Sequence, residues 1–343
     1  MGAALTAIEK GMADARRARA GGDLHAVERL LADAHRASTS LEPEHSMRAI
    51  VGWRHLKALF DLGRVEQAEK VLLDVLELPE PFGEGSGGIR AAEPIARGIW
   101  DRLGYGRPSV RTLWTRYVDQ WEQGGDPWMA ACGRAQLLWE WACAGEMVRV
   151  HEAVEAIACA TPSRFAGGPS RHPLAPDAAG SLFYAQMDHA RTAAWASVWS
   201  ADEKLARLAL ELYADALAEA ELPEDYWFVE STARAELRFG WPLDAVERWE
   251  VEARRLDHGR AALHLGLAQA ELGADPAASL AHLLPEADEA GPEWGVDARR
   301  VLVRSANDDL RSERWEAEAN ATIEQYGLGV FRPEASPAQV AER

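Results

Sequence analysis

The chain has 343 residues, of which 48 % are hydrophobic and 27 % are charged, so it carries enough apolar material for a sizeable core and too much for a disordered chain. Its formal net charge of -18 at pH 7 repels nucleic acid and anionic membranes and favours a partner that is neutral or basic overall. No uninterrupted apolar run approaches the roughly 18 residues that a membrane-spanning helix needs, which excludes a membrane partner or membrane insertion.

The N-terminal residues and the cysteines indicate the compartment. Met1 to Arg19 has the pattern of an amphipathic helix with charges spread through it, and it lacks the apolar segment of a signal peptide. Three cysteines, Cys132, Cys143 and Cys159, form no Cys-x-x-Cys pair, and any disulfide would leave one of them unpaired. We therefore expect a cytoplasmic protein.

A pattern recurs along the chain in which a glycine is followed by apolar residues at offsets of 2, 5, 8, 9 and 12 positions. It starts at Gly22 (Leu24, Val27, Leu30, Leu31, Ala34), at Gly63 (Val65, Ala68, Val71, Leu72, Val75) and at Gly145 (Met147, Val150, Ala153, Val154, Ile157). At about 100° per residue these offsets fall on one side of an α-helix. A glycine just before the helix is typical of a tight turn, because glycine accepts the positive φ that a helix C-terminus needs. The pattern therefore predicts helical hairpins, with Gly63 and Gly145 in left-handed conformations.

The spacing of the glycines predicts how many hairpins there are. Gly63 and Gly145 are twice as far apart as Gly22 and Gly63, so a weaker unit is expected near Gly104. Later units open at Gly240 and Gly273 with looser spacing. We expect an all-α chain of roughly six or seven hairpins.

These hairpins resemble the tetratricopeptide-repeat (TPR) family, which places a large aromatic and a Leu-Gly pair on the first helix, a glycine in the turn, and a small residue on the second helix. One unit matches through Leu265, Gly266, Gly273 and Ala278, and another through Trp53, Leu56, Phe60, Gly63, Ala68 and Leu72. The resemblance implies an α-solenoid of antiparallel helical hairpins, since a single hairpin cannot bury its apolar face alone. It also implies a concave face that binds a protein or peptide.

Two segments interrupt the repeats and set the expected domain boundaries. Residues 82–89 are glycine-rich and are expected to be a flexible connector, and residues 162–177 carry four prolines and are expected to form a mobile loop that proteases cut first. The chain is therefore divided into N-terminal hairpins 1–81, connector 82–89, central hairpins 90–161, loop 162–177, C-terminal hairpins 178–328 and a tail 329–343.

Signals for catalysis or metal binding are weak. His151 and Glu155 stand one helical turn apart, a spacing that can hold a metal, but no third ligand can be identified, so we expect both to be solvated polar positions opposite the apolar stripe. Asn307, Asp308 and Asp309, with Glu313 further on, resemble the acidic magnesium clusters of all-α terpene cyclases, but their spacing matches neither motif of that family, and the segment fits a polar helix start equally well. We therefore expect no catalytic residue, no metal and no cofactor, while an all-α enzyme with an unrecognised site stays an alternative.

Basic and aromatic residues gather between residues 89 and 121, against the acidic background of the chain. If a helix begins near Pro108, Arg107 and Arg111 share a face with Trp114. An arginine pair beside an indole can hold a carboxylate or a phosphate. The alternative is that these arginines pair with acidic residues of adjacent repeats.

Tryptophan is frequent, with 14 residues, and most are expected to wedge the helices of a hairpin together. Trp139 and Trp141 point to opposite sides of one helix, so at least one is a candidate for the binding groove. The candidate partner-binding residues are Arg107, Arg111, Trp114, Tyr117, Trp121, Trp139 and Trp141. The leading hypothesis is a non-catalytic scaffold or adaptor that binds a protein or peptide; the alternatives are an enzyme, or recognition of an anionic ligand or nucleic acid through residues 89–121.

Overall fold

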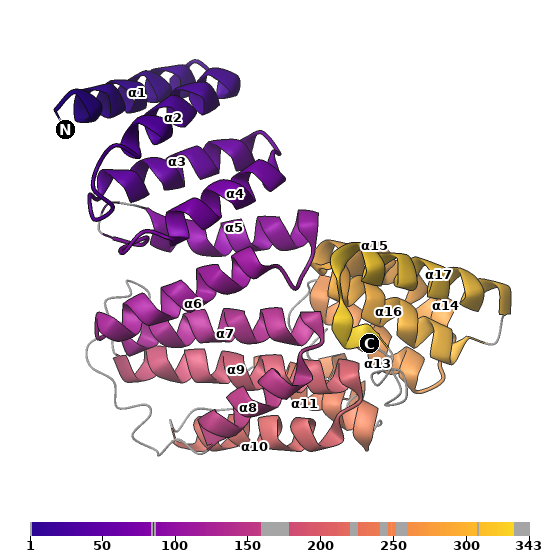
Figure 1. The fold of residues 1–343 in the computed structure, drawn as a ribbon. Coiled ribbons are helices and arrows are strands. Elements are labelled where there is room, and N and C mark those ends of the chain that lie inside the picture. Colours follow the sequence, from indigo (N-terminus) through magenta and orange to yellow (C-terminus); the bar gives the residue numbers. More distant parts are fainter. Residues whose placement is uncertain are drawn as a thin grey trace, which may run out of the picture. The chain divides into compact units, whose positions relative to one another are not determined.

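The computed structural model describes residues 2–83, 85, 87–158, 178–219, 226–240, 246–247, 249–251, 259–306 and 309–332. Over these ranges the regular structure is entirely helical and comprises 16 α-helices (Figure 1). The all-α prediction is therefore confirmed. The expected mobile loop 162–177, with its proteolytic site, lies outside the described residues.

The chain forms two compact units, residues 1–137 (unit 1) and 138–343 (unit 2). They divide within helix α7 (Pro127–Ala144). The sequence interruption at 82–89 falls within unit 1 and the one at 162–177 falls within unit 2. Neither marks the boundary, because the two units are defined by which helices pack together and not by local composition.

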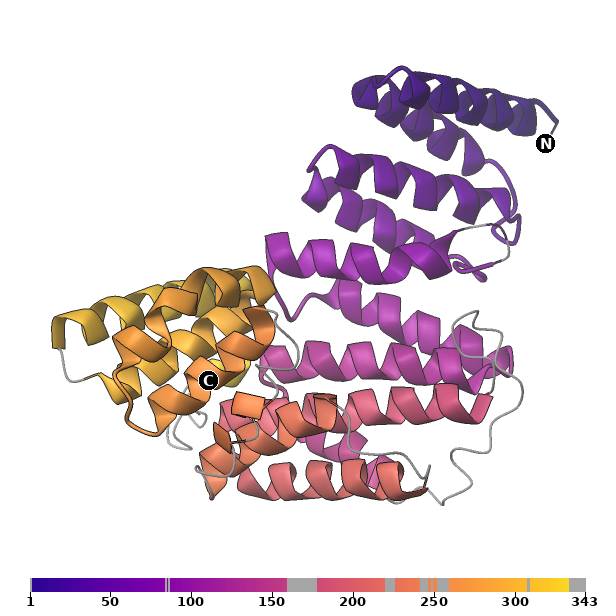
Figure 2. The ribbon, with the colours of Figure 1, turned by 180° about the vertical axis from the view of Figure 1, so that it is seen from behind.

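Unit 1 is a succession of helices joined by short turns (Figure 2). They are α1 (Gly2–Ala20), α2 (Leu24–Ser38), α3 (Met47–Asp61), α4 (Val65–Leu76), α5 (Gly88–Leu103), α6 (Pro108–Gln123) and the first part of α7. Consecutive helices from α1 to α6 pack on each other, and α3 also packs on α5 and α4 on α6. The apolar stripe read from the sequence is the buried face of α4, where Val65, Ala68, Val71, Leu72 and Val75 are all buried.

The glycine turns have the conformation that the repeat pattern predicts. Gly63 has φ +69° and Gly145 has φ +81°, so both predicted left-handed glycines are confirmed. The weaker unit also exists, since Gly104 (φ +83°) separates α5 from α6. Glycine is needed at these positions because a side chain strains a backbone with positive φ.

The expected flexible connector 82–89 is held at both ends. Phe82 is buried, and its ring contacts those of Trp53 (centroids 5.6 Å apart) and Tyr117 (5.2 Å). The Trp53 indole N–H also donates to the Pro81 carbonyl over 2.6 Å. Helix α5 then begins at Gly88, so the glycine-rich run is shorter than its composition indicates.

Unit 2 contains the second part of α7 and two groups of packed helices. The first comprises α8 (Met147–Ala158), α9 (Ala178–Ser200), α10 (Glu203–Glu219) and α11 (Tyr226–Phe239), which pack around α9. The second comprises α13 (Gly259–Glu271), α14 (Pro276–Ser279), the 3₁₀ turn η2 (Ala281–Leu283), α15 (Leu284–Ala290), α16 (Pro292–Ser305) and α17 (Asp309–Tyr326). A last 3₁₀ turn, η3 (Gly329–Phe331), packs on α9.

The first residues of the expected tail belong to the core of unit 2. Val330 and Phe331 are buried, together with the preceding Leu328. Gly329 lies so close to the turn between α7 and α8 that a Cβ there would be 1.9 Å from the Ala144 carbonyl oxygen. Apolar side chains and a glycine thus dock residues 329–332, and residues 333–343 lie outside the described residues.

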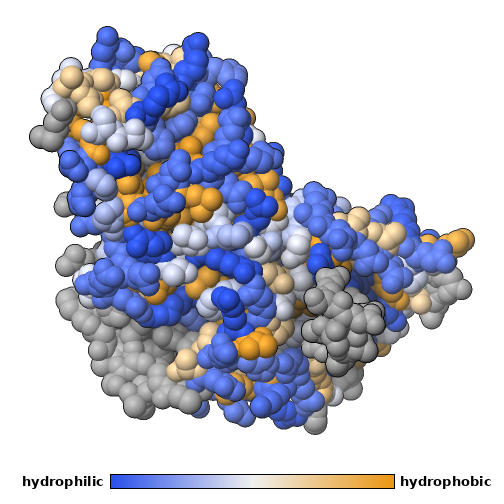
Figure 3. Space-filling view, in the orientation of Figure 1, coloured by the Kyte–Doolittle hydropathy of each residue, from blue (hydrophilic) through white to orange (hydrophobic). Residues whose placement is uncertain are grey.

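None of the helices in the described ranges combines the length and the apolar character that crossing a bilayer requires. On the face of the molecule drawn in Figure 3, hydrophilic residues predominate and hydrophobic ones appear in small separate groups. Most of the apolar side chains named above are therefore buried between packed helices.

Candidate functional site

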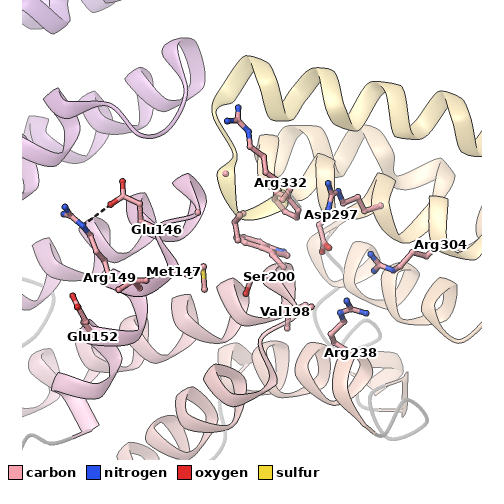
Figure 4. A pocket seen from close by; sticks show the side chains of 18 residues that line it. Glu146, Met147, Arg149, Glu152, Val198, Ser200, Arg238, Asp297, Arg304 and Arg332 are labelled. Atoms are coloured by element: carbon pink, nitrogen blue, oxygen red, sulfur yellow. Dashed lines mark ion pairs between the residues drawn. The ribbon is translucent and has the colours of Figure 1, made fainter. Parts of the chain in front are cut away.

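Unit 2 contains an open pocket of ≈ 860 Å³, here called the arginine pocket (Figure 4). It is bounded by the start of α8, the end of α9, the end of α11, the face of α16, and η3 with the residue after it. Five arginines line it: Arg149, Arg238, Arg300, Arg304 and Arg332. Three acidic residues also line it, namely Glu146, Glu152 and Asp297. Such a concentration of arginine is unexpected in a chain of net charge -18.

Close backbone packing forms one wall of the pocket. Gly145 and Gly329 both line it, and a Cβ on Gly145 would lie 2.5 Å from the carbonyl carbon of Gly329. Only glycine permits this approach of η3 to the turn between α7 and α8. Phe331 follows directly and packs its ring on that of Trp199, with centroids 5.5 Å apart. Together with Val198, these rings give the pocket an apolar wall.

A buried ion pair lies beneath the pocket. Asp297 on α16 is 4 % exposed, and its carboxylate accepts a hydrogen bond of 2.7 Å from Arg234 on α11, which is 1 % exposed. The Arg234 guanidinium also lies over the Trp195 ring at 5.7 Å. A buried carboxylate needs such a partner, because an unpaired charge in the interior is costly. Arg234 therefore compensates the charge of Asp297 on the side away from the pocket.

An aromatic cluster surrounds this ion pair. The His264 imidazole is stacked between the indoles of Trp195 (5.5 Å) and Trp249 (4.6 Å), and Trp294 meets it edge-on. The Glu230 carboxylate pairs with His264 from the neighbouring helix. All five side chains are buried, so the base of the pocket is rigidly packed.

Three of the five pocket arginines have an acidic neighbour. Arg149 pairs with Glu146 (3.0 Å), Arg304 with Glu271 (2.7 Å) and Arg332 with Glu324 (3.5 Å). These three side chains are largely exposed at the rim. Ion pairs in such positions are weak and exchange easily with solvent.

Arg238 and Arg300 differ from the other three. Both are half-buried, and neither forms an ion pair with any described residue. The Arg300 guanidinium lies 5.6 Å from the centre of the Phe331 ring, and Arg304 follows one helical turn later. Burial, and then the positive charge of Arg304, lowers the pKa of Arg300. Figure 4 shows Arg238 and Arg304 on the same side of the pocket as Asp297, with Arg149 and Glu152 on the opposite side. Chemically, this side of the pocket is suited to an anion.

The candidate residues of unit 1 lie in a packed helix face. Arg107 donates to the Glu69 carboxylate on α4 through Nε (3.0 Å) and Nη2, and Ser109 donates to the same group. Trp114 and Tyr117 are buried, while Arg111 and Trp121 are half-buried. The pairing of Arg107 with an acidic residue of the adjacent hairpin agrees with the structural alternative. A binding role for these five residues stays a prediction.

The other two candidates, Trp139 and Trp141, lie beside the arginine pocket. Trp139 meets the ring of Trp199 edge-on at 5.6 Å, and the Arg149 guanidinium lies 5.6 Å from the Trp141 ring. Trp199 and Arg149 line the pocket, so these two tryptophans support its walls from behind. Sequence reasoning missed Arg238 and Arg300, although the spacing of Arg300 and Arg304 is the signal that selected Arg107 and Arg111.

The weak metal signals can be examined in part. The Nε2 of His151 on α8 pairs with the Oδ2 of Asp202, the residue just before α10, over 2.6 Å. This ion pair already engages the imidazole of His151. Within the described residues no group of three or more His, Cys, Asp or Glu side chains is arranged to hold a metal. The side chains of residues 307–309 lie outside the described part of the chain.

Comparisons with known proteins identify no relative: no family model matches this chain, and no curated protein matches its sequence.

Proposed function

We propose that this chain is a binding protein that holds a segment of a protein partner in the arginine pocket. The observation that carries the proposal is the pocket, ≈ 860 Å³ of open space lined by both apolar side chains and arginines. This volume lies within the range of about 300–1,000 Å³ that is usual for ligand sites, and it can take several side chains of a peptide. A rigid base of stacked aromatic rings keeps it preformed.

The packing of unit 1 supports the same class of function. Each helix from α3 to α6 contacts its next or next-but-one neighbour, which is typical of stacked helical hairpins. We therefore propose a TPR-like α-solenoid for these hairpins. Solenoids of this kind commonly bind proteins or peptides, although the fold alone does not fix a function. In the proposal, the chain is a non-catalytic scaffold or adaptor.

The net charge of -18 favours a partner that is neutral or basic overall. A locally acidic segment on such a partner reconciles this global preference with a pocket lined by arginines. Long-range attraction would then bring the partner near, and the pocket would select the segment.

The proposal is tested by selecting peptides from a random display library on the full chain and measuring their affinities by fluorescence polarisation. Val148 lines the pocket and is 72 % exposed, so Val148→Trp narrows the entrance without disturbing the core. Val251 is 59 % exposed and is not part of the pocket lining, so Val251→Trp is the matched control. We expect Val148→Trp to weaken the selected peptides by about tenfold or more, or about 1.4 kcal/mol, and the control to leave them unchanged. Equal affinities for both variants would place binding elsewhere and refute the proposal.

A further inference from the structure

We infer that the arginine pocket recognises an acidic protein segment, and that Arg300 and Arg238 hold a carboxylate of that segment. The inference rests on the proposed function and names the chemistry of the segment. Three observations lead to it: the balance of charges in the pocket, the surroundings of Arg300, and the apolar and acidic side chains that line the rest of the pocket.

Among the described residues, Arg238 and Arg300 are the two pocket arginines without an ion pair. Asp297 is satisfied by Arg234 from beneath, and Glu146 is satisfied by Arg149 at the rim. The charges of Asp297 and Glu316 act on Arg300 without reaching ion-pair distance, and Glu152 lies across the pocket, so neither Arg238 nor Arg300 has an ion pair with a residue that the structure describes. A ligand carboxylate would supply a counter-charge to Arg300 on α16, the helix that also carries Asp297 and Arg304, and to Arg238 on α11.

Arg300 is also poorly solvated for a cation. It is half-buried and rests on the Phe331 ring, which offers only partial compensation for lost water. Arg304 adds positive charge one turn further along α16, and burial lowers the pKa of Arg300. A guanidinium in this state gains most from a carboxylate, which accepts two parallel hydrogen bonds in the plane of the fork.

The rest of the pocket favours a peptide over a free anion or a polyanion. Met147, Val198 and Phe331 line the pocket, and Val148 stands exposed at its edge. These apolar surfaces suit the side chains that flank an acidic residue in a peptide. Arg149, Glu146 and Glu152 lie across the pocket from Arg238 and Arg304, and their charges sum to one negative charge, which disfavours a ligand with dense negative charge there.

The test compares two fluorescein-labelled synthetic peptides, one of alternating Glu and Leu and one with Gln in place of every Glu, by fluorescence anisotropy with the full chain. We expect the Glu peptide to bind about tenfold tighter or more, with an affinity that falls as salt is added. The preference should disappear in the double variant Arg300→Gln with Arg238→Gln. It should survive in Arg207→Gln, which removes one charge from an exposed ion pair on α10. Arg300→Lys keeps the charge without the fork and should give an intermediate affinity.

The outcomes separate the inference from the proposed function. Equal binding of the two peptides, or a Glu preference that persists in the double variant, overturns the inference. Displacement of the Glu peptide by inorganic phosphate at concentrations where acetate has no effect also overturns it, since the site would then be specific for a phosphate group. Library peptides that contain no acidic residue and are lost in Val148→Trp would overturn the inference but leave the proposed function standing. If both the library peptides and the Glu peptide still bind the Val148→Trp variant, the inference and the proposed function are both overturned.

Discussion

Two histidines face each other between α2 and α3, in the interior of unit 1. The Nδ1 atoms of His35 and His55 are 3.2 Å apart, and the Nε2 of His55 lies 3.5 Å from the Glu28 carboxylate. In a hydrogen bond between two imidazole nitrogens one donates and the other accepts, so the two rings cannot both be fully protonated while it persists. Burial lowers the pKa of both histidines. The charge of His55 lowers the pKa of His35 further, while the hydrogen bond and the negative charge of Glu28 partly offset the effect of burial on the pKa of His55.

This pair predicts a loss of stability in mild acid. Because the folded pKa values lie below the unfolded value of about 6.5, the unfolded chain binds protons first as the pH falls. The stabilisation is therefore complete above about pH 6.5 and declines as the pH falls towards the folded pKa values. Thermal melting at a series of pH values should show this decline, and His35→Gln should reduce it. His25 is exposed on the same helix, so His25→Gln should keep the wild-type pH profile. An unaltered profile in His35→Gln would contradict the assignment.

The glycines at two turns predict a graded pair of stability effects. Gly63 and Gly145 share a left-handed backbone, but a Cβ at Gly63 would meet no atom within 4 Å. Gly63→Ala should therefore lower the free energy of unfolding by about 1 kcal/mol, from backbone strain alone. Gly145→Ala should cost a further 1–3 kcal/mol or so, because its Cβ collides with the backbone of Gly329. Urea unfolding measures both, and equal losses would show that the contact with Gly329 yields easily.

Helix α6 is fixed on α4 by one cluster of polar groups. Arg107 lies just before α6 and Ser109 in its first turn, and both donate to Glu69 on α4. Burial raises the pKa of Glu69, but the hydrogen bonds from Arg107 and Ser109 outweigh it and lower the pKa overall. The cluster thus holds two neighbouring hairpins in register.

A double-mutant cycle over Arg107→Ala and Glu69→Ala measures this coupling. The Arg107 side chain is 39 % exposed, so solvent screens part of the interaction, and we expect about 1 kcal/mol. The exposed pair Arg97 and Glu93 on α5 is the matched control, with an expected coupling of about 0.3–0.5 kcal/mol. If the coupling of Arg107 proves no larger than that of the control, the arginine is free enough to serve a partner, as the sequence hypothesis for residues 89–121 requires.

The sequence predicts helices better than it predicts the pocket. The stripe of α4 and the glycines at 63, 104 and 145 are local signals, because a helix face and a positive φ depend on neighbouring residues. Phe82 shows the limit of composition: a single aromatic ring anchors the start of a glycine-rich run, and only its distant contacts reveal this. The pocket could not be predicted in this way, since α8, α11, α16 and the residue after η3 each bring one or two of its arginines from separate parts of the chain.

The charge of the whole molecule predicts what it does not bind. A net charge of -18 opposes any polyanion, and the five pocket arginines are gathered in one pocket instead of along a surface that could follow a phosphate backbone. A fluorescein-labelled DNA duplex should therefore show no anisotropy change with the full chain at physiological salt, under conditions where the Glu peptide binds. Binding of the duplex that weakens steeply with salt would instead favour the nucleic-acid alternative.

The close backbone contact between Gly145 and Gly329 also determines when the pocket can form during synthesis. Chains emerge from the ribosome at about 5–20 residues per second, so the residues that meet at this contact are made many seconds apart. Until synthesis has passed Phe331 and Arg332, the arginines of α8 and α16 have no closed wall between them. On the proposed function, a copy that ends before Arg332 would therefore be unable to hold the partner segment. Occupancy of the pocket would thus report that a copy had been made at least as far as Arg332 and had folded.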